Sequence, residues 1–185
     1  MRTTLTLLAL LPFLSVASPI TANAGTAYCF GDGSGTACPC GNVDPSGLGG
    51  CLHASSPVLG PGAVLSSSGT EIPTVADDTV MLTVTGLPPV TALLFFQGTA
   101  TLGAGAGIVF GDGLRCAGGT IIRLKVKMST GGTVSFPETG EPQLHIAGAI
   151  PGTSSTRYYQ GWYRNPSPFC TPAFFNLSNG LQIDW

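Results

Sequence analysis

Glycine and proline interrupt this sequence so often that no long regular element can form. The chain has 27 glycines and 15 prolines among 185 residues, and both residue types break helices and central strands. The intervals between them are short and rich in β-branched, aromatic and leucine residues, which favour strands. Many short strands separated by turns are typical of antiparallel sandwiches and barrels. We therefore predict an all-β fold, an antiparallel β-sandwich of Ig-like or jelly-roll-like type.

Two runs carry the clearest strand patterns. Residues 79–85 alternate, with Val80, Leu82 and Val84 on one side and mainly threonines on the other, as in a half-buried strand. Residues 92–96 are continuously apolar, which indicates a central strand buried on both faces. Further strands are predicted at 107–110, 120–128, 132–136, 143–147, 156–164 and 181–185.

The predicted strand at 120–128 should have one charged face. Arg123, Lys125 and Lys127 alternate there with apolar residues, and successive side chains of a strand point to opposite faces. The three cations would then share one solvent-exposed face of a half-solvated strand.

The N-terminus has the order of a secretory signal peptide. Arg2 supplies a positive charge, an apolar run follows at 5–17, and Ala22-Asn23-Ala24 has the small residues of a cleavage site. We predict a signal peptide at 1–24, with cleavage after Ala17 as the alternative. The apolar run is shorter than the ~20 residues of a membrane span. We therefore expect a secreted or cell-surface protein with no transmembrane span after signal removal.

Six cysteines lie beyond either cleavage site, and an even number in an exported chain predicts three disulfides. Cys38 and Cys40 are too close to pair with each other without strain, so each should pair outward with one of the other two N-terminal cysteines. We predict that the four N-terminal cysteines pair among themselves and that the last two form a bridge. A zinc site including His53 is the alternative, disfavoured because no Cys-x-x-Cys pair is present. The cysteines are Cys29, Cys38, Cys40, Cys51, Cys116 and Cys170.

The amino-acid composition of the chain changes near residue 77. Residues 25–76 are rich in Gly, Ser, Pro and Cys and hold few long apolar side chains, so this segment cannot build a core alone. We interpret 25–76 as a loop-rich, disulfide-stapled N-terminal arm and 77–185 as the β-sandwich domain.

Charge and chemistry exclude several classes of function. The formal net charge is −2 and only 9% of residues are charged, so no basic patch for a nucleic-acid partner is expected. A serine triad would need one of two histidines, and His145 lies in the predicted strand 143–147, where we place it on the solvent face. No Gly-x-Ser-x-Gly elbow is present. We expect no catalytic residues; a small extracellular hydrolase is the weaker alternative.

Two sets of residues offer binding chemistry. Tyr158, Gln160 and Trp162 share one face of the predicted strand at 156–164 and could stack on sugar rings, unless that face is the core. Asp32 and Asp112 each lie in a Phe-Gly-Asp-Gly turn, where they either hold Asx-turns or contribute to a calcium site. No other cofactor is expected.

Five segments together resemble a group of uncharacterised secreted, cysteine-containing β-domains that are common in planctomycete-type and other large-genome bacteria. The resemblance covers most of the chain beyond the predicted signal, and it implies export and a small β-sandwich closed by late strands. It carries no activity with it. The segments are Tyr28–Gly35 (YCFGDGSG), Cys38–Asn42 (CPCGN), Phe110–Cys116 (FGDGLRC), Tyr159–Asn165 (YQGWYRN) and Phe175–Leu181 (FNLSNGL).

Together these features predict a secreted or cell-surface structural or interaction module. Its partner is expected to be a cell-surface protein or a polysaccharide. The alternative is a carbohydrate-binding module that uses the aromatic face of the strand at 156–164.

Overall fold

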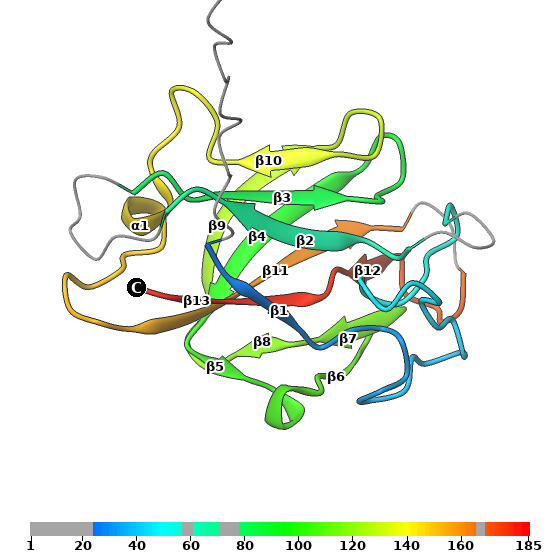
Figure 1. The fold of residues 1–185 in the computed structure, drawn as a ribbon. Helices are drawn as coiled ribbons and strands as arrows, with labels where there is room; N and C mark the ends of the chain where they lie inside the picture. Colours follow the sequence, from blue (N-terminus) through cyan, green and yellow to red (C-terminus); the bar gives the residue numbers. More distant parts are fainter. Residues whose placement is uncertain (1–23, 57–60, 71–77, 166–168) are drawn as a thin grey trace, which may run out of the picture.

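The computed structural model describes residues 24–56, 61–70, 78–165 and 169–185 of the chain (Figure 1). Of the predicted signal peptide, only Ala24 lies within these ranges, so the candidate cleavage after Ala17 lies outside the described residues. The fold is built from antiparallel strands arranged as a sandwich, as the sequence predicts.

The largest sheet has the strand order β1-β13-β11-β4-β9, and β12 pairs with the end of β11. All its pairings are antiparallel. The two central strands, β11 and β4, pair with each other and with a further strand on either side. The strands are β1 (Thr26–Tyr28), β4 (Ala92–Gly98), β9 (Ile122–Met128), β11 (Thr156–Arg164), β12 (Phe175–Leu177) and β13 (Gly180–Asp184).

A second sheet, of order β10-β3-β2, packs on the inner face of the large sheet (Figure 1). Alternation on β3 directs Leu82 and Val84 inward, where they meet Leu93 and Phe95 of β4. This layer of fully buried side chains is the hydrophobic core, and α1 lies at its edge. The elements are β2 (Val64–Ser68), β3 (Met81–Thr85), β10 (Val134–Phe136) and α1 (Leu144–Ala147).

Two short two-stranded pairs, β5–β8 and β6–β7, lie on the other side of the large sheet (Figure 1). Ala117 of β8 packs with Phe96 of β4 and with Leu177 of β12 in a small apolar cluster. This side of the large sheet is called the outer face below. The elements are β5 (Ala100–Thr101), η1 (Gly103–Gly105), β6 (Ile108–Phe110), β7 (Gly113–Arg115) and β8 (Ala117–Gly118).

The predicted strand at 143–147 is wrong, because this segment forms the single-turn helix α1. His145 is buried rather than solvent-facing. Its backbone N–H and ring Nδ1 both lie at hydrogen-bond distance from Asp78 Oδ2, at 2.8 and 3.1 Å. A four-residue run is too short for its apolar spacing to separate a strand from one helical turn.

The expected all-cation face of the strand at 120–128 is also wrong. A β-bulge in the β4–β9 pairing sets Lys125 opposite Phe95 but Arg123 opposite Phe96, which point to opposite sides of the sheet. Alternation is lost at the bulge. Lys127 lies opposite the inward-facing Leu93, on the same side as Lys125; it is mostly buried and paired with Glu138 and Glu141, whereas Val126 is 63% exposed.

All six cysteines form disulfides, but with a different pairing from the one predicted. The bonds are Cys29–Cys116, Cys38–Cys51 and Cys40–Cys170. Only Cys38–Cys51, which links the residues closest in sequence, stays within the arm, and the other two bonds join the arm to the rest of the fold. The arm also supplies β1 to the large sheet and β2 to the second sheet, which brings its cysteines beside distant segments.

The clearest strand predictions are confirmed. Residues 81–85 form β3, with Val80, Leu82 and Val84 buried, and β4 lies between two neighbouring strands. The strand at 156–164 is β11. Within the described ranges, no helix has the length and apolar character needed to cross a membrane.

Candidate functional site

Strand β11 places its aromatic residues on two different sides of the sheet. Tyr159 and Tyr163 enter the core, where they are almost completely buried. Trp162 points the other way and is 37% exposed on the outer face. Its cross-strand neighbours are Leu94 on β4 and Leu177 on β12.

Around Trp162 the outer face is hollowed into a groove of about 950 Å³. A smaller hollow of about 170 Å³ continues it toward β6 and β7, and the two share Leu94, Arg123 and Trp162. We call the two hollows together the outer groove. Its lining includes Ala92, Leu94, Phe96, Phe110, Arg115, Ile121, Arg123, Val126, Trp162, Arg164, Ala173, Phe174, Phe175 and Leu177.

Aromatic rings in edge and tilted contacts hold the wall of the groove. Phe175 packs against Trp162 with ring centroids 5.4 Å apart and against Phe110 at 4.9 Å. The Phe175 ring occupies the space that a side chain on Gly111 would need, and Gly111 also has a positive φ of 62°. The tight turn from β6 to β7 thus depends on glycine and brings Phe110 onto Phe175.

The groove gathers positive charge in a chain that is negative overall. Three of the chain's seven lysines and arginines line it from the outer side: Arg115, Arg123 and Arg164. Lys125 borders the larger hollow but lies opposite the inward-facing Phe95. Among the described residues, no aspartate or glutamate lines either hollow. Lys125 is paired with Glu141 at 3.5 Å, and the Arg115 guanidinium lies 5.9 Å from the centre of the Phe110 ring.

The rim of the groove is apolar and open to solvent. Val126 of β9, Phe110 of β6 and Phe174 line the two hollows and are all well exposed. Exposed apolar surface costs free energy in water, and a continuous patch of it marks a binding surface more often than isolated residues do. The outer groove is therefore the strongest candidate site in the described part of the chain.

Of the three predicted platform residues, only Trp162 lines the outer groove. Tyr158 and Gln160 lie on the same face of β11, but Tyr158 is packed against Tyr28 and Gln160 is fully buried. The Gln160 amide donates to Leu114 O and Ser178 O and accepts from Cys116 N–H, at 2.7 to 2.9 Å. It therefore attaches the β7–β8 segment to the sheet.

The two predicted metal ligands, Asp32 and Asp112, both accept hydrogen bonds from other residues of the chain. Asp32 forms an Asx-turn, accepting the backbone N–H of Ser34 at 2.9 Å, and the Ser34 hydrogen bonds lower the pKa of Asp32. Asp112 is buried and accepts from Thr171 N–H at 2.8 Å and from Asn165 Nδ2 at 3.0 Å. No cluster of three potential metal ligands occurs within the described ranges.

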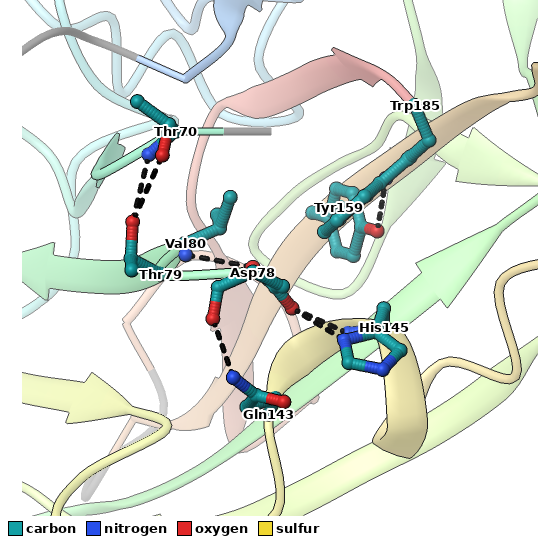
Figure 2. A network of polar contacts seen from close by, with 8 residues as sticks. All are labelled: Thr70, Asp78, Thr79, Val80, Gln143, His145, Tyr159 and Trp185. Carbon is teal, nitrogen blue, oxygen red and sulfur yellow. Dashed lines mark hydrogen bonds and ion pairs between the residues drawn. The ribbon is translucent and has the colours of Figure 1, made fainter. Parts of the chain in front are cut away.

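Figure 2 shows a second candidate, the buried pair of Asp78 and His145. Asp78 also accepts the N–H of Val80 at 2.7 Å and its carbonyl oxygen accepts from Gln143 Nε2, so the carboxylate joins α1 to β3. A catalytic triad needs a hydroxyl on the other imidazole nitrogen. Within the described residues, His145 Nε2 is buried and has no hydrogen-bond partner, so no triad is seen at this pair.

His53, the other histidine, is also internal. Its Nε2 lies 2.7 Å from the carbonyl oxygen of Gly86, and its Nδ1 accepts the N–H of Ser55 at 3.2 Å. These partners fit the neutral imidazole. Burial lowers the pKa of His53, and the hydrogen bond to Gly86 opposes the shift. Because all six cysteines are in disulfides, the zinc alternative is excluded for them.

Sequence reasoning found Trp162 but missed most of the groove. Arg164 could have been found, because it follows Trp162 at the two-residue spacing of one strand face. Arg123 was assigned to a face that the bulge divides, and Phe174 and Phe175 reach the groove only through the fold.

Comparisons with protein-family models, curated proteins and solved structures found no match. The resemblance to secreted bacterial domains stays a prediction.

Proposed function

We propose that this protein is a non-enzymatic extracellular binding module and that the outer groove is its binding surface. The observation that carries the proposal is a half-exposed tryptophan at the centre of an open, aromatic and cationic groove on a disulfide-bonded scaffold. Pockets of 300 to 1,000 Å³, mostly apolar with a few polar groups, are the usual form of small-molecule sites.

The scaffold supports this role because it holds the groove on rigid elements. The floor comes from β4, β9 and β11, whose backbone groups are already used in the sheet. The wall formed by Ala173, Phe174 and Phe175 comes shortly after Cys170 in the sequence, and Cys170 is bonded to Cys40 in the arm. Three disulfides suit an oxidising, extracellular setting, in keeping with the predicted signal peptide.

The chemistry of the groove favours this proposal over the two alternatives. Sugar recognition relies on side-chain hydrogen bonds to hydroxyl groups, but no Asn, Gln, Asp, Glu, Ser or Thr lines either hollow in the described part of the chain. A hydrolase needs a nucleophile and a base in reach of each other, and the His145 pair provides only one half of that arrangement.

The test uses anilinonaphthalene sulfonate, an aromatic anion whose fluorescence rises in apolar sites. We expect saturable binding that weakens about tenfold in Trp162→Ala, the loss of one well-placed aromatic contact. Ile146→Ala is the matched control, because Ile146 is an exposed apolar residue on α1 that does not line the groove. Equal binding by both variants and the wild type would contradict the proposal.

A further inference from the structure

Resting on the proposed function, we propose that the outer groove binds an apolar carboxylate: a small molecule with a hydrocarbon body and a single carboxylate head. The body lies along Trp162 and Leu94, and the head is bound by Arg123, with Arg164 as the second cation. Two independent properties of the lining lead to this ligand class.

The first property is the shortage of neutral hydrogen-bonding groups. Apart from the charged residues, the lining side chains of the larger hollow are aliphatic or aromatic. The Tyr163 hydroxyl is buried on the other side of the sheet, which leaves only the indole N–H of Trp162. Backbone groups in the floor are paired within the sheet. A sugar or an extended peptide would lose water from its hydroxyl or amide groups here without replacement, at a cost for each group.

The second property is uncompensated positive charge. Arg123 lines both hollows and Arg164 lines the larger one, and neither makes an ion pair among the described residues. A guanidinium binds a carboxylate through two parallel hydrogen bonds. Since no acidic side chain lines the groove in the described part of the chain, a ligand carboxylate would meet no repulsion there and no competitor for the arginines.

The position of Arg123 makes it the better anchor. The bulge in β9 turns Arg123 to the same side as Phe96, whereas Lys125 faces the other side and is held by Glu141. Arg123 therefore stands between the two hollows, beside Leu94 and Trp162. A ligand bound at Arg123 can extend its apolar body along the larger hollow toward Phe174, where apolar surface is already exposed.

The experiment compares three ligands that share one hydrocarbon chain. Dodecanoate, dodecanol and dodecyltrimethylammonium are titrated against the disulfide-bonded protein by calorimetry and tryptophan fluorescence. The two ionic ligands are kept below their micelle concentrations and dodecanol below its solubility limit. We expect dodecanoate to bind at least tenfold more tightly than dodecanol, and the cation to bind most weakly. Raising the salt concentration should weaken the binding of dodecanoate and leave the binding of dodecanol nearly unchanged.

Arg123→Gln tests the anchor. We expect about a tenfold loss of dodecanoate affinity and no change for dodecanol. Arg157→Gln is the matched control, because Arg157 lies on β11 outside the groove lining and donates to the carbonyl oxygen of Thr156. Its dodecanoate affinity should equal that of the wild type.

The outcomes separate this inference from the proposed function. Equal affinity for all three ligands, abolished by Trp162→Ala, would overturn the carboxylate proposal while supporting the groove as a binding surface. An Arg123→Gln variant that binds dodecanoate like the wild type would also overturn it. Failure of every ligand to bind, together with no binding of anilinonaphthalene sulfonate, would overturn both.

Discussion

The two faces of the large sheet use the same strands for different purposes. On β4 and β11, Phe95 and Tyr163 point inward and are almost completely buried against the second sheet, whereas Trp162 points outward and is half exposed. The inner face thus has the apolar area needed for stability. The outer face is covered only in part, and the uncovered part keeps aromatic and cationic side chains in contact with solvent. Alternation along a strand lets one sheet carry a core and a site together.

The covered part of the outer face is held in a different way from the core. The arm contains few long apolar residues, and disulfides and buried amides attach it and the short strand pairs to the fold. Gln160 bonds to the backbone of Leu114 and Cys116, and Asn42 donates to the carbonyl oxygens of Leu52 and Asp112. The comparison therefore predicts that covalent bonds matter most on the outer side and packing most on the inner side.

The largest expected effect comes from cutting the bond that ties the arm to the groove wall. Replacing Cys40 and Cys170 by alanine removes a link between residues 130 apart, for which the chain-entropy relation gives a loss of about 5 kcal/mol in the free energy of unfolding. The matched pair Cys38→Ala with Cys51→Ala opens a 13-residue link and should cost about 3 kcal/mol. Urea denaturation of both double variants checks the order, and a reversed order would contradict the account.

The next largest effect is the difference in stability lost when a side chain is truncated on one face of the large sheet or on the other. Phe95→Ala leaves a cavity in the core and is expected to cost about 3–5 kcal/mol. Trp162→Ala removes a half-exposed side chain and should cost about 1 kcal/mol or less. Thermal and urea unfolding of the two variants provide the comparison. Similar losses for both would show that the outer face also carries stability.

A smaller effect is expected from the buried His53. Its pKa is lowered in the folded state, so as the pH falls below about 6.5 the unfolded chain binds a proton before the folded one does. The contribution of His53 to the free energy of unfolding is therefore fully present above that pH and is lost as the pH falls. The loss is about 1.4 kcal/mol for each pH unit between the pKa of His53 in the unfolded chain and its lower pKa in the folded protein.

The control for this prediction is His53→Gln, which keeps a donor for the Gly86 carbonyl oxygen but does not titrate. Unfolding free energies measured from pH 7 to pH 5 should fall less steeply in the variant than in the wild type. Parallel curves would mean that His53 does not contribute to the acid sensitivity.

The strand pattern and the division of β11 into two faces could be predicted because they depend on local alternation. The sequence could not predict which face of β11 lies in the core, because that depends on where the second sheet packs. The disulfide pairing failed for a similar reason: β1 pairs with β13 from the far end of the chain, which brings Cys29 near Cys116. The bulge opposite Phe95 and Phe96 leaves no pattern in sequence, yet it decides that Arg123 faces the groove.

The most direct measurement compares quenching of tryptophan fluorescence by iodide and by caesium at low ionic strength. The protein has two tryptophans, and Trp185 is buried with its indole N–H bonded to the Tyr159 hydroxyl. If Trp162 stands in an open, cationic groove, iodide should quench strongly, caesium weakly, and the iodide-sensitive part should disappear in Trp162→Phe. Equal quenching by the two ions, or iodide quenching that survives in Trp162→Phe, would contradict the account.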